Sequence, residues 1–351
     1  MLEFRIMREP ILIWGAGAIG GTIGAYWARA GVPVLLVDIV KEHVEACRTT
    51  GLRITGPIEE FRQVVPAVTP DALSGTYRRI VLAVKAGATP DALAALKPHL
   101  AQDGFVLSAQ NGLNEIAIAE AVGPERTMGC FVNFGADWLG PGEILFGNRS
   151  AVVVGEIDGT TTERAQEMQR LLQIFEPDAV LTDNIWGYLW GKLAYGAMLF
   201  GTALTDDSMS ENFADPRRLP VWLALGREVG AVAAGRGVTS LGFGEFDPMV
   251  FAPGAPEEPQ QRTVRWLADY TSQSAKTHSG IHRDLAVRKR KTEVDMQIAV
   301  ISKLGREVGV ETPAIDRLVE LIHDIENGRR PLAFETLNEL IETCTSASTT
   351  A

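Results

Sequence analysis

The first half of the chain alternates short apolar runs with segments of helical spacing. Apolar runs of strand length occur at residues 11–14, 32–37, 80–84 and 105–108. The stretches at 18–30 and 90–100 place apolar side chains at the three- and four-residue spacing of a helix. Continuous apolar runs separated by helices are typical of βαβ units. This half is therefore predicted to form a parallel sheet with helices on both faces.

Glycine and proline mark the ends of these elements. Gly31 follows the first helical stretch, where a glycine commonly ends a helix. Pro33 cannot donate a ladder hydrogen bond, so it must lie near the start of its strand. Residues 130–154 have the pattern of extended segments and are expected to supply the last strands of the same sheet. A helix is predicted over 161–175, followed by a short strand over 179–181.

After about residue 184 the pattern becomes helical. Helices are predicted over 186–204, 219–236, 263–304 and 314–326, the third interrupted at Gly280, with a Gly- and Pro-rich loop over 242–261. The fold class predicted is therefore α/β, with an N-terminal Rossmann-type doubly wound sheet and a C-terminal all-helical domain. The expected boundaries are 1–183 for the first domain, 184–342 for the second and 343–351 for a small, polar, disordered tail.

Length, charge and cysteine content narrow the function. A chain of 351 residues favours two domains. A net charge of -11 repels polyanions, which argues against binding to nucleic acid or to a membrane surface. The apolar stretches are shorter than the roughly 18 residues of a membrane helix. Three scattered cysteines suggest a reducing compartment rather than a disulfide framework. A cytoplasmic protein is expected.

A glycine-rich turn follows the first predicted strand. Its sequence is Gly15-Ala16-Gly17-Ala18-Ile19-Gly20, the GxGxxG pattern. The first glycine permits a tight turn, the second lets the backbone approach a pyrophosphate, and the third allows close packing of helix on strand. The N-terminus of the following helix then offers N–H groups and a positive dipole end to phosphates. We expect these six residues to bind a dinucleotide.

An acidic residue ends the second predicted strand. Asp38 lies 18 residues after Gly20, close to the offset of about 20 at which a carboxylate binds ribose hydroxyls. A carboxylate there repels a 2′-phosphate, so NAD(H) is favoured over NADP(H), although Lys41 could soften the repulsion. The alternative is that Asp38 caps the next helix.

Further short motifs, taken together, resemble those of the ketopantoate reductase (2-dehydropantoate 2-reductase) family. They are Val84-Lys85, Gln110-Asn111-Gly112, Trp190-Gly191-Lys192-Leu193, Lys291-Thr292-Glu293-Val294-Asp295, and Gly309-Val310 followed by Thr312-Pro313. Their order and spacing are more specific than any single motif. The resemblance covers roughly residues 10–328. It implies a Rossmann domain followed by a helical domain, with the active site in the cleft between them.

The resemblance also implies a role for individual residues. Lys192 matches the family's catalytic lysine, the general acid that protonates a ketone oxygen as hydride arrives. Glu293 matches the acid that binds and orients the substrate, and Asn111 the asparagine near both nicotinamide and substrate. Lys85 matches a lysine near the cofactor. The chemistry is independently reasonable, because a cation beside a carbonyl stabilises the charge that hydride addition creates.

Each of these residues also has a purely structural interpretation. Lys192 could be a surface lysine of a helix, and Glu293 could pair with Lys289 four residues earlier. Asn111 could simply form a turn, and Lys85 could be an ordinary strand-end lysine.

Three departures from the family pattern bear on the substrate. The family usually has asparagines four and eight residues after the catalytic lysine, where this chain has Gly196 and Phe200. A polar segment that holds the pantoyl group is replaced by residues 277–281, which include His278 and Ser279. The spacing from Asp284 to Glu293 is one residue longer than expected. Gly196, Phe200, His278 and Ser279 are therefore the candidate substrate-binding residues, and the preferred substrate is expected to differ.

Two further features receive weaker interpretations. His278 and His282 are four residues apart, but no third ligand stands at motif spacing, so no metal is predicted. The basic run 288–291 is expected to be solvated, or to raise the local potential for an anionic ligand.

The leading hypothesis is hydride transfer between a nicotinamide and a small, anionic 2-oxo or 2-hydroxy acid or a related ketone or alcohol. The alternatives are an opine- or hydroxyacyl-type dehydrogenase, and a protein that senses NAD(H) without turnover. A homodimer is the assembly considered.

Overall fold

The computed structural model describes residues 9–273 and 276–347. It divides the chain into two compact units, Met1–Ile185 and Trp186–Ala351. This division falls two residues after the expected boundary between 183 and 184.

The first unit alternates strands and helices. Its strands are β1 (Ile11–Trp14), β2 (Val34–Val37), β3 (Leu52–Thr55), β4 (Phe61–Gln63), β5 (Ala67–Val68), β6 (Tyr77–Leu82), β7 (Leu100–Ser108), β8 (Thr127–Val132), β9 (Gly135–Gly140), β10 (Glu143–Asn148), β11 (Val152–Glu156) and β12 (Val180–Leu181). Its helices are α1 (Ala18–Arg29), α2 (Lys41–Arg48), α3 (Thr89–Leu96), α4 (Asn114–Val122) and α5 (Glu163–Phe175).

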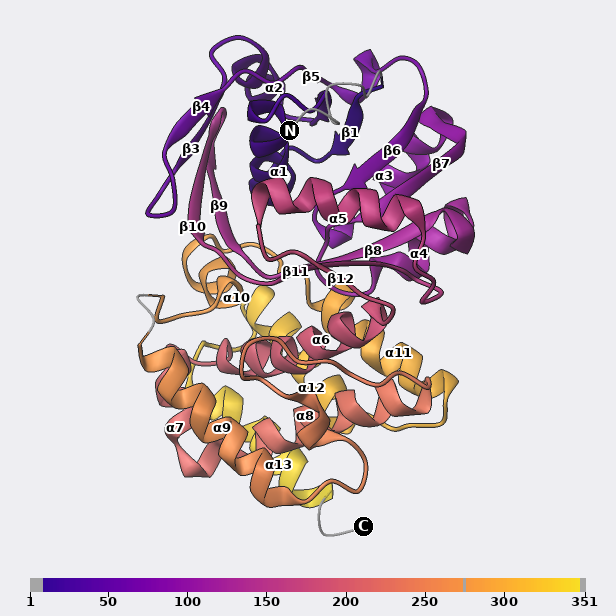
Figure 1. Cartoon of the computed structure of the whole chain (residues 1–351). Helices are drawn as coiled ribbons and strands as arrows, with labels where there is room; N and C mark the ends of the chain where they lie inside the picture. Colours follow the sequence, from indigo (N-terminus) through magenta and orange to yellow (C-terminus); the bar gives the residue numbers. More distant parts are fainter. Residues whose placement is uncertain (1–8, 274–275, 348–351) are drawn as a thin grey trace. The chain divides into compact units, whose positions relative to one another are not determined.

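The main sheet has the strand order β12-β11-β8-β7-β6-β1-β2-β5. From β5 to β8 neighbouring strands are parallel, and only the β11–β8 pair at the far side is antiparallel. In β1, Ile11 and Ile13 face a core shared with α1 and α5, while Leu12 and Trp14 face a core shared with α3 and α4. Burial on both faces explains the continuous apolar runs, and the predicted α/β fold is confirmed (Figure 1).

The assignment of residues 130–154 to one sheet was wrong in part. Strands β8 and β11 do belong to the main sheet, but β9 and β10 form a second sheet with β3 and β4, in the order β4-β3-β10-β9. The strands of the two sheets differ in how deeply their residues are buried. Every residue of β8 and β11 is buried, whereas β9 is only partly covered and leaves Trp138 and Leu139 exposed. Such a strand suits a small sheet on the surface rather than the interior of a parallel one.

The second unit is helical. Its helices are α6 (Ile185–Thr202, which starts at the last residue of the first unit), α7 (Met209–Ala214), α8 (Leu219–Gly235), α9 (Glu257–Ser272), α10 (Gly280–His282), α11 (Val300–Glu307), α12 (Pro313–Glu326) and α13 (Phe334–Ala347). Two π-helical turns, Arg283–Val287 and Asp295–Ala299, precede α11. No helix of the described residues is long and apolar enough to cross a membrane.

Three expectations for this unit need correction. The loop over 242–261 ends early, because α9 begins at Glu257 with two acidic residues in its first turn, where the helix dipole favours them. The long helix over 263–304 is broken before Gly280, which starts α10 rather than interrupting a helix. Residues 343–347 are helical, because Leu337, Leu340 and Cys344 form a buried stripe of α13. Residues 348–351 of the expected tail lie outside the described residues.

Candidate functional site

The glycine turn lies at the carboxyl end of β1, which pairs with β6 and β2 inside the main sheet. Gly15 has a φ of +98°, and a Cβ there would lie 2.8 Å from the backbone of Ala83. A Cβ on Gly20 would lie 2.1 Å from the carbonyl oxygen of Gly15. At Gly17, by contrast, an added Cβ would meet no heavy atom within 4 Å in the described part of the chain. Two glycines thus allow close packing, and the third leaves open space beside the first turn of α1, as a pyrophosphate cradle requires.

Asp38 reaches back to this turn. Its Oδ2 accepts a hydrogen bond from the Ala16 N–H at 2.9 Å, and its Oδ1 accepts one from the Val40 N–H at 3.0 Å. The second bond matches the capping interpretation, because Val40 is the N-cap of α2. The carboxylate remains partly exposed and is held beside the glycine turn. The structural and the ribose-binding interpretations are therefore compatible.

The loops that carry Lys85 and Asn111 follow the next two strands, β6 and β7. The side-chain amide of Gln110 donates to the carbonyl oxygen of Val84 at 2.9 Å and to the hydroxyl of Thr89 at 2.8 Å. These bonds tie the two loops together, and both Lys85 and Asn111 are exposed. The chain crosses from one side of β1 to the other between β2 and β6, and such a switch point is where open α/β sheets bind their ligands.

Glu115 is a buried acid that the sequence analysis missed. It lies in the first turn of α4, and neither carboxyl oxygen has a hydrogen-bond partner of good geometry among the described residues. Burial raises the pKa of Glu115 to about 8, an effect that its own backbone N–H and the Ser108 hydroxyl partly oppose. The sequence does contain a pattern that could have indicated it: Glu115, Ile118 and Val122 recur at helical spacing and form one buried stripe of α4. An acid on such a stripe is a candidate for a neutral carboxyl group.

In the second unit, Lys192 lies on a less buried face of α6. The partly exposed positions 188, 192, 195, 196 and 199 recur at helical spacing, while the rest of the helix between them is buried. A Cβ added to Gly196, one turn after Lys192, would meet no heavy atom within 4 Å among the residues that the structure describes. Phe200, by contrast, is only 1% exposed and packs in the core of this unit. Lys192 and Gly196 thus share a face with room beside it.

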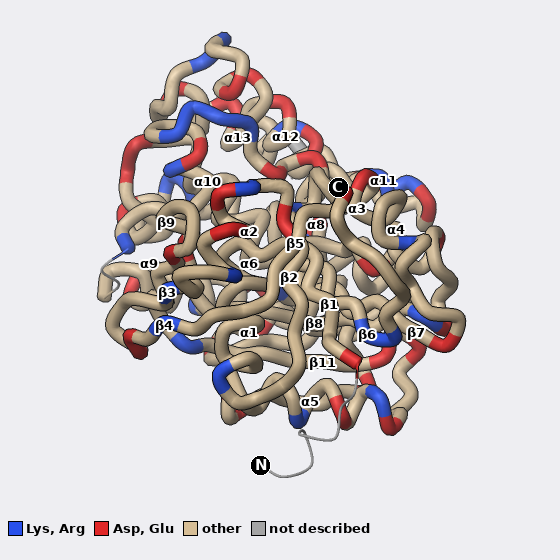
Figure 2. Tube along the Cα trace, turned by 90° about the horizontal axis from the view of Figure 1, so that it is seen from above, with Lys and Arg blue, Asp and Glu red and all other residues tan. Residues whose placement is uncertain are grey.

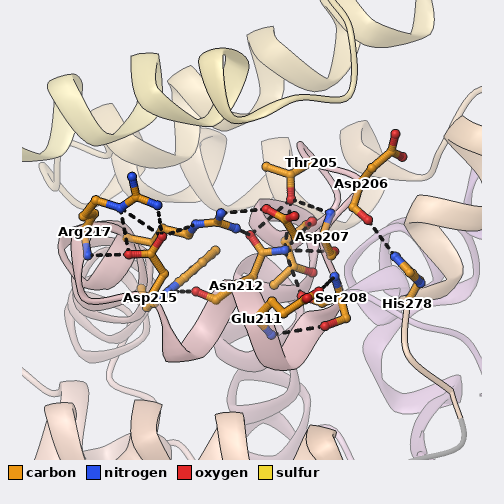
Figure 3. A network of polar contacts seen from close by, with 12 residues as sticks. Thr205, Asp206, Asp207, Ser208, Glu211, Asn212, Asp215, Arg217 and His278 are labelled. Carbon is orange, nitrogen blue, oxygen red and sulfur yellow. Dashed lines mark hydrogen bonds and ion pairs between the residues drawn. The ribbon is translucent and has the colours of Figure 1, made fainter.

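The segment with His278 and Ser279 is fixed to the loop between α6 and α7 (Figure 3). The Met209 N–H donates to the carbonyl oxygen of Thr277 at 2.9 Å. A ring nitrogen of His278 lies 3.0 Å from the carbonyl oxygen of Asp206, and one of His282 lies 3.1 Å from its carboxylate. The two imidazole rings lie against each other with centroids 4.3 Å apart. Because both rings are held by Asp206, this pair is organised by the fold rather than by a ligand.

A buried network of hydrogen bonds and ion pairs fixes the loop between α6 and α7. The guanidinium of Arg218, which is 6% exposed, contacts Asp207 at 2.6 Å, Asn212 at 2.6 Å and Asp215 at 3.2 Å. Figure 3 shows the same network extending to Ser208, whose hydroxyl caps α7. Within the described residues, no group of three or more His, Cys, Asp or Glu is placed to hold a metal ion.

Glu293 lies between the two π-helical turns and is partly exposed. Its neighbours are anchored to α12. The Thr292 N–H and hydroxyl both donate to Glu326 at 2.7 Å, and the ring of His323 lies 3.0 Å from Glu326 and 2.9 Å from Asp295. Burial lowers the pKa of His323, but the hydrogen bonds to Glu326 and Asp295 outweigh it, so the pKa is raised. Residues on both sides of Glu293 are thereby held in place.

The basic run 288–291 precedes this acid and appears as an unbroken blue stretch in Figure 2. Arg288 and Arg290 each contact the carboxylate of Asp284 at 2.9 Å. Lys289, between them, adopts a φ of 47°, in the left-handed region that costs energy for a side-chain-bearing residue. This left-handed residue lies within the segment between Asp284 and Glu293. Two of the four basic charges are engaged by Asp284 rather than simply solvated.

Comparison with known proteins decides the family. A family model described as "Ketopantoate reductase PanE/ApbA" matches residues 11–159, and its C-terminal counterpart matches residues 184–326. The chain belongs to the ketopantoate reductase family. Ketopantoate reductases are oxidoreductases that use a nicotinamide cofactor, so the chain is an enzyme of that class.

Relatives of known name agree along nearly the whole length. The 2-dehydropantoate 2-reductase of Streptococcus pyogenes is 25% identical over 316 residues, covering 89% of this chain and 96% of the relative. That of Archaeoglobus fulgidus is 28% identical over 326 residues, covering 92% and 99%. Among solved structures, a PanE/ApbA family ketopantoate reductase from Ralstonia eutropha has a TM-score of 0.74 at 25% identity, covering 91% and 99%. A D-mandelate dehydrogenase solved with NADH and anilino(oxo)acetate has a TM-score of 0.78 at 24% identity, covering 91% and 98%.

Proposed function

We propose that this enzyme transfers hydride from NADH to the carbonyl carbon of a small 2-oxo acid, and in reverse from the matching 2-hydroxy acid, with Lys192 as the general acid and base. The observation that carries the proposal is the face of α6 on which Lys192 lies beside the open space at Gly196. A cation next to unfilled space is what a carbonyl substrate needs, because hydride addition makes its oxygen negative.

The preference for NADH rests on Asp38. Its carboxylate is held at the glycine turn by two backbone N–H groups, so it cannot easily turn away from a ribose bound there. A fixed negative charge accepts hydrogen bonds from a 2′-hydroxyl and repels a 2′-phosphate. Lys41 softens this repulsion less, because it also lies near the carboxylate of Asp71. The pKa of Asp71 is lowered mainly by a hydrogen bond from Thr69 and further by the charge of Lys41.

The chemistry assigns one task to each residue. A bound nicotinamide supplies the hydride. The ammonium of Lys192 donates its proton to the carbonyl oxygen as the new C–H bond forms, which leaves a neutral amine that solvent protonates again. Glu293 accepts a hydrogen bond from the substrate, and its anchored neighbours Thr292 and Asp295 keep it in position. Asn111, after β7, would lie beside the nicotinamide and the substrate, and Lys85, after β6, would lie near the cofactor; both residues are exposed.

The substrate is proposed to be larger or less polar than ketopantoate. Gly196 stands beside Lys192 where the family pattern has an asparagine, so an amide group that could pair with a polar substrate is missing. Phe200, at the second asparagine position, is buried in the core, so the expected contact between Phe200 and the substrate is not carried forward. His278 and Ser279 replace part of the polar segment, and both are already engaged within the protein. A site without those donors no longer favours a hydroxylated side chain.

The test is an activity panel on the purified full chain. Ketopantoate, branched 2-oxo acids and aromatic 2-oxo acids are assayed with NADH and with NADPH, and the matching 2-hydroxy acids with the oxidised cofactors. We expect turnover with NADH and a higher kcat/KM for a branched or aromatic acid than for ketopantoate. The D-mandelate dehydrogenase of the same fold, solved with NADH, makes mandelate an apt first choice.

Two results would contradict the proposal. NADH binding without turnover of any acid would favour a sensing role, and turnover of an amino-acid–oxo-acid pair or of a hydroxyacyl thioester would favour an opine- or hydroxyacyl-type dehydrogenase.

A homodimer is also proposed. A structure of the same fold, at 17% identity and a TM-score of 0.67, is described as a dimeric ketopantoate reductase from Staphylococcus aureus. Light scattering of the purified chain tests this assembly.

A further inference from the structure

His43 is a buried histidine of α2 that has no place in the mechanism above. It is 1% exposed, and its ring lies between two backbone groups that are far apart in the sequence. One ring nitrogen, Nε2, lies 2.8 Å from the carbonyl oxygen of Ala16 in the glycine turn. The other, Nδ1, accepts a hydrogen bond from the Gly142 N–H at 2.9 Å. Gly142 belongs to the turn between β9 and β10 in the second sheet.

These two contacts fix the protonation of the ring. A backbone N–H can only donate, so Nδ1 must be the unprotonated acceptor, and the indole N–H of Trp138 also points to it at 3.5 Å. A carbonyl oxygen can only accept, so Nε2 must carry the hydrogen and donate to Ala16. His43 is therefore neutral, in its Nε2–H form.

The backbone N–H and the carbonyl oxygen of Ala16 both form hydrogen bonds within the protein. Its N–H donates to Asp38 at 2.9 Å, and its carbonyl oxygen accepts from His43 at 2.8 Å. The oxygen also lies against α1, since a Cβ on Gly21 would come within 2.6 Å of it. The peptide plane between Ala16 and Gly17 thus has one defined orientation.

That orientation determines where the next N–H points. In a trans peptide unit the carbonyl and the following N–H point in opposite directions. With the Ala16 carbonyl directed inward to His43, the Gly17 N–H is directed to the opposite side of the peptide plane. Gly17 is the residue at which an added Cβ would meet no heavy atom within 4 Å in the described chain. It is also the N-cap of α1, where anions are favoured.

We propose that His43 is a positioning residue for the cofactor: it holds the Ala16 carbonyl so that the Gly17 N–H faces the pyrophosphate of the bound dinucleotide. The second sheet takes part, because its Gly142 N–H keeps the ring in the one neutral form that can donate to Ala16. The turn is packed closely against α2, since Gly142 has a φ of +74° and a Cβ there would lie 2.7 Å from the Cβ of Ala46. The inference rests on the proposed cofactor site.

Two substitutions separate the two hydrogen bonds of His43. The amide of His43→Gln lies about where Nε2 was, so it can still donate to Ala16 but leaves Gly142 without its acceptor. The amide of His43→Asn lies about where Nδ1 was, so it can still accept from Gly142 but leaves the buried Ala16 carbonyl without its donor. Each variant loses one hydrogen bond, so the two should lose similar thermal stability.

The readout is the Kd for NADH, measured by calorimetry beside the thermal unfolding midpoint of each variant. We expect His43→Asn to bind NADH about tenfold more weakly than His43→Gln, the scale of one lost hydrogen bond, at similar midpoints. An equal loss of NADH affinity in both variants, or an unchanged Kd for NADH in both, would overturn the proposal. If the wild-type chain binds neither NADH nor NADPH, the proposed cofactor site fails instead, and this result is distinct.

A second measurement needs no substitution. Long-range proton–nitrogen NMR on histidine-labelled wild-type protein reports which ring nitrogen carries hydrogen. We expect a neutral Nε2–H form for His43, assigned by the loss of its signal in His43→Gln. A neutral Nδ1–H form, or a doubly protonated ring at neutral pH, would overturn the proposal.

Discussion

The two units build their candidate sites in different ways. In the first unit the glycine turn presents backbone N–H groups, and side chains such as Asp38 and His43 serve to hold the backbone. In the second unit the candidate groups are side chains, Lys192 on a helix and Glu293 between two π-helical turns.

This difference indicates which of the two sites can acquire a new ligand specificity through single substitutions. A backbone site tolerates little, because a Cβ on Gly15 or Gly20 would lie within 3 Å of other backbone atoms. A side-chain site changes whenever a residue such as Gly196 is replaced, because open space lies beside it. A fixed cofactor class and a variable substrate are the expected result within one family.

The largest expected effect concerns the reacting groups of the second unit. Lys192→Ala should lower kcat by roughly 10²-fold or more, the usual contribution of a general acid, and leave the Kd for NADH within about twofold. Steady-state kinetics and calorimetry measure the two quantities. Lys303→Ala, at an exposed position of α11, is the matched control and should keep full activity. An unchanged kcat in Lys192→Ala would remove this residue from the mechanism.

The next effect concerns the cofactor preference of the first unit. Asp38→Ala should weaken NADH binding about tenfold relative to NADPH binding, because it removes a charged acceptor for the ribose and a repulsion against the 2′-phosphate. The ratio of the two Kd values is decisive, since loosening of the Ala16 turn affects both cofactors alike. Asp178→Ala, an exposed acid elsewhere in this unit, should leave the ratio unchanged. Equal losses for both cofactors would refute the NAD(H) assignment.

An effect of similar size tests the space beside Lys192. Gly196→Asn puts an amide where an added Cβ has no close neighbour, so the variant should fold normally. We expect kcat/KM to fall by roughly tenfold for aromatic or branched 2-oxo acids and to fall less, or rise, for ketopantoate. The ratio of kcat/KM for an aromatic or branched 2-oxo acid to kcat/KM for ketopantoate is compared between variant and wild type. A general loss of activity leaves this ratio unchanged, so no separate control variant is needed. A parallel change for both substrates would mean that Gly196 does not face the substrate.

The last prediction concerns stability rather than catalysis or binding. Burial raises the pKa of Glu115 to about 8, so the folded protein holds a proton that the unfolded carboxyl group releases above its ordinary pKa of 4.5. The contribution of Glu115 is therefore fully present below pH 4.5 and is lost as the pH rises toward 8. The free energy of unfolding of Glu115→Gln relative to wild type should rise by about 1–3 kcal/mol from pH 5 to pH 8. Urea unfolding at both values measures it, and a constant difference would contradict a neutral Glu115.

Much of the first unit could be predicted from the sequence, because its signals are local. A strand, a glycine turn and an acid near the right offset follow one another within about thirty residues. The second sheet could not be predicted, because β10 pairs with β3, which lies far away in the sequence. His43 was missed for the same reason. Nothing near it in sequence reveals that Ala16 and Gly142 meet at its ring.

The second unit was predicted in outline and less well in detail. The helices with a continuous apolar stripe, such as α8 and α12, were found within a few residues. The start of α9 was missed, because its polar first turns have the composition of a loop. The π-helical turns around Glu293 and the left-handed conformation of Lys289 depend on contacts with Asp284 and Glu326, which no local pattern encodes.

The pairing of β3 with β10 has a consequence for how the protein is made. Arg53 and Glu143, which are side by side in that sheet, are separated by 90 positions in the chain. The intervening segment must close on itself before Gly142 can reach His43, and contacts of such long range form slowly. A newly synthesised chain is therefore expected to complete its glycine turn only after most of the parallel sheet has assembled. Dinucleotide present in the cell would then stabilise the finished chain rather than guide its early collapse.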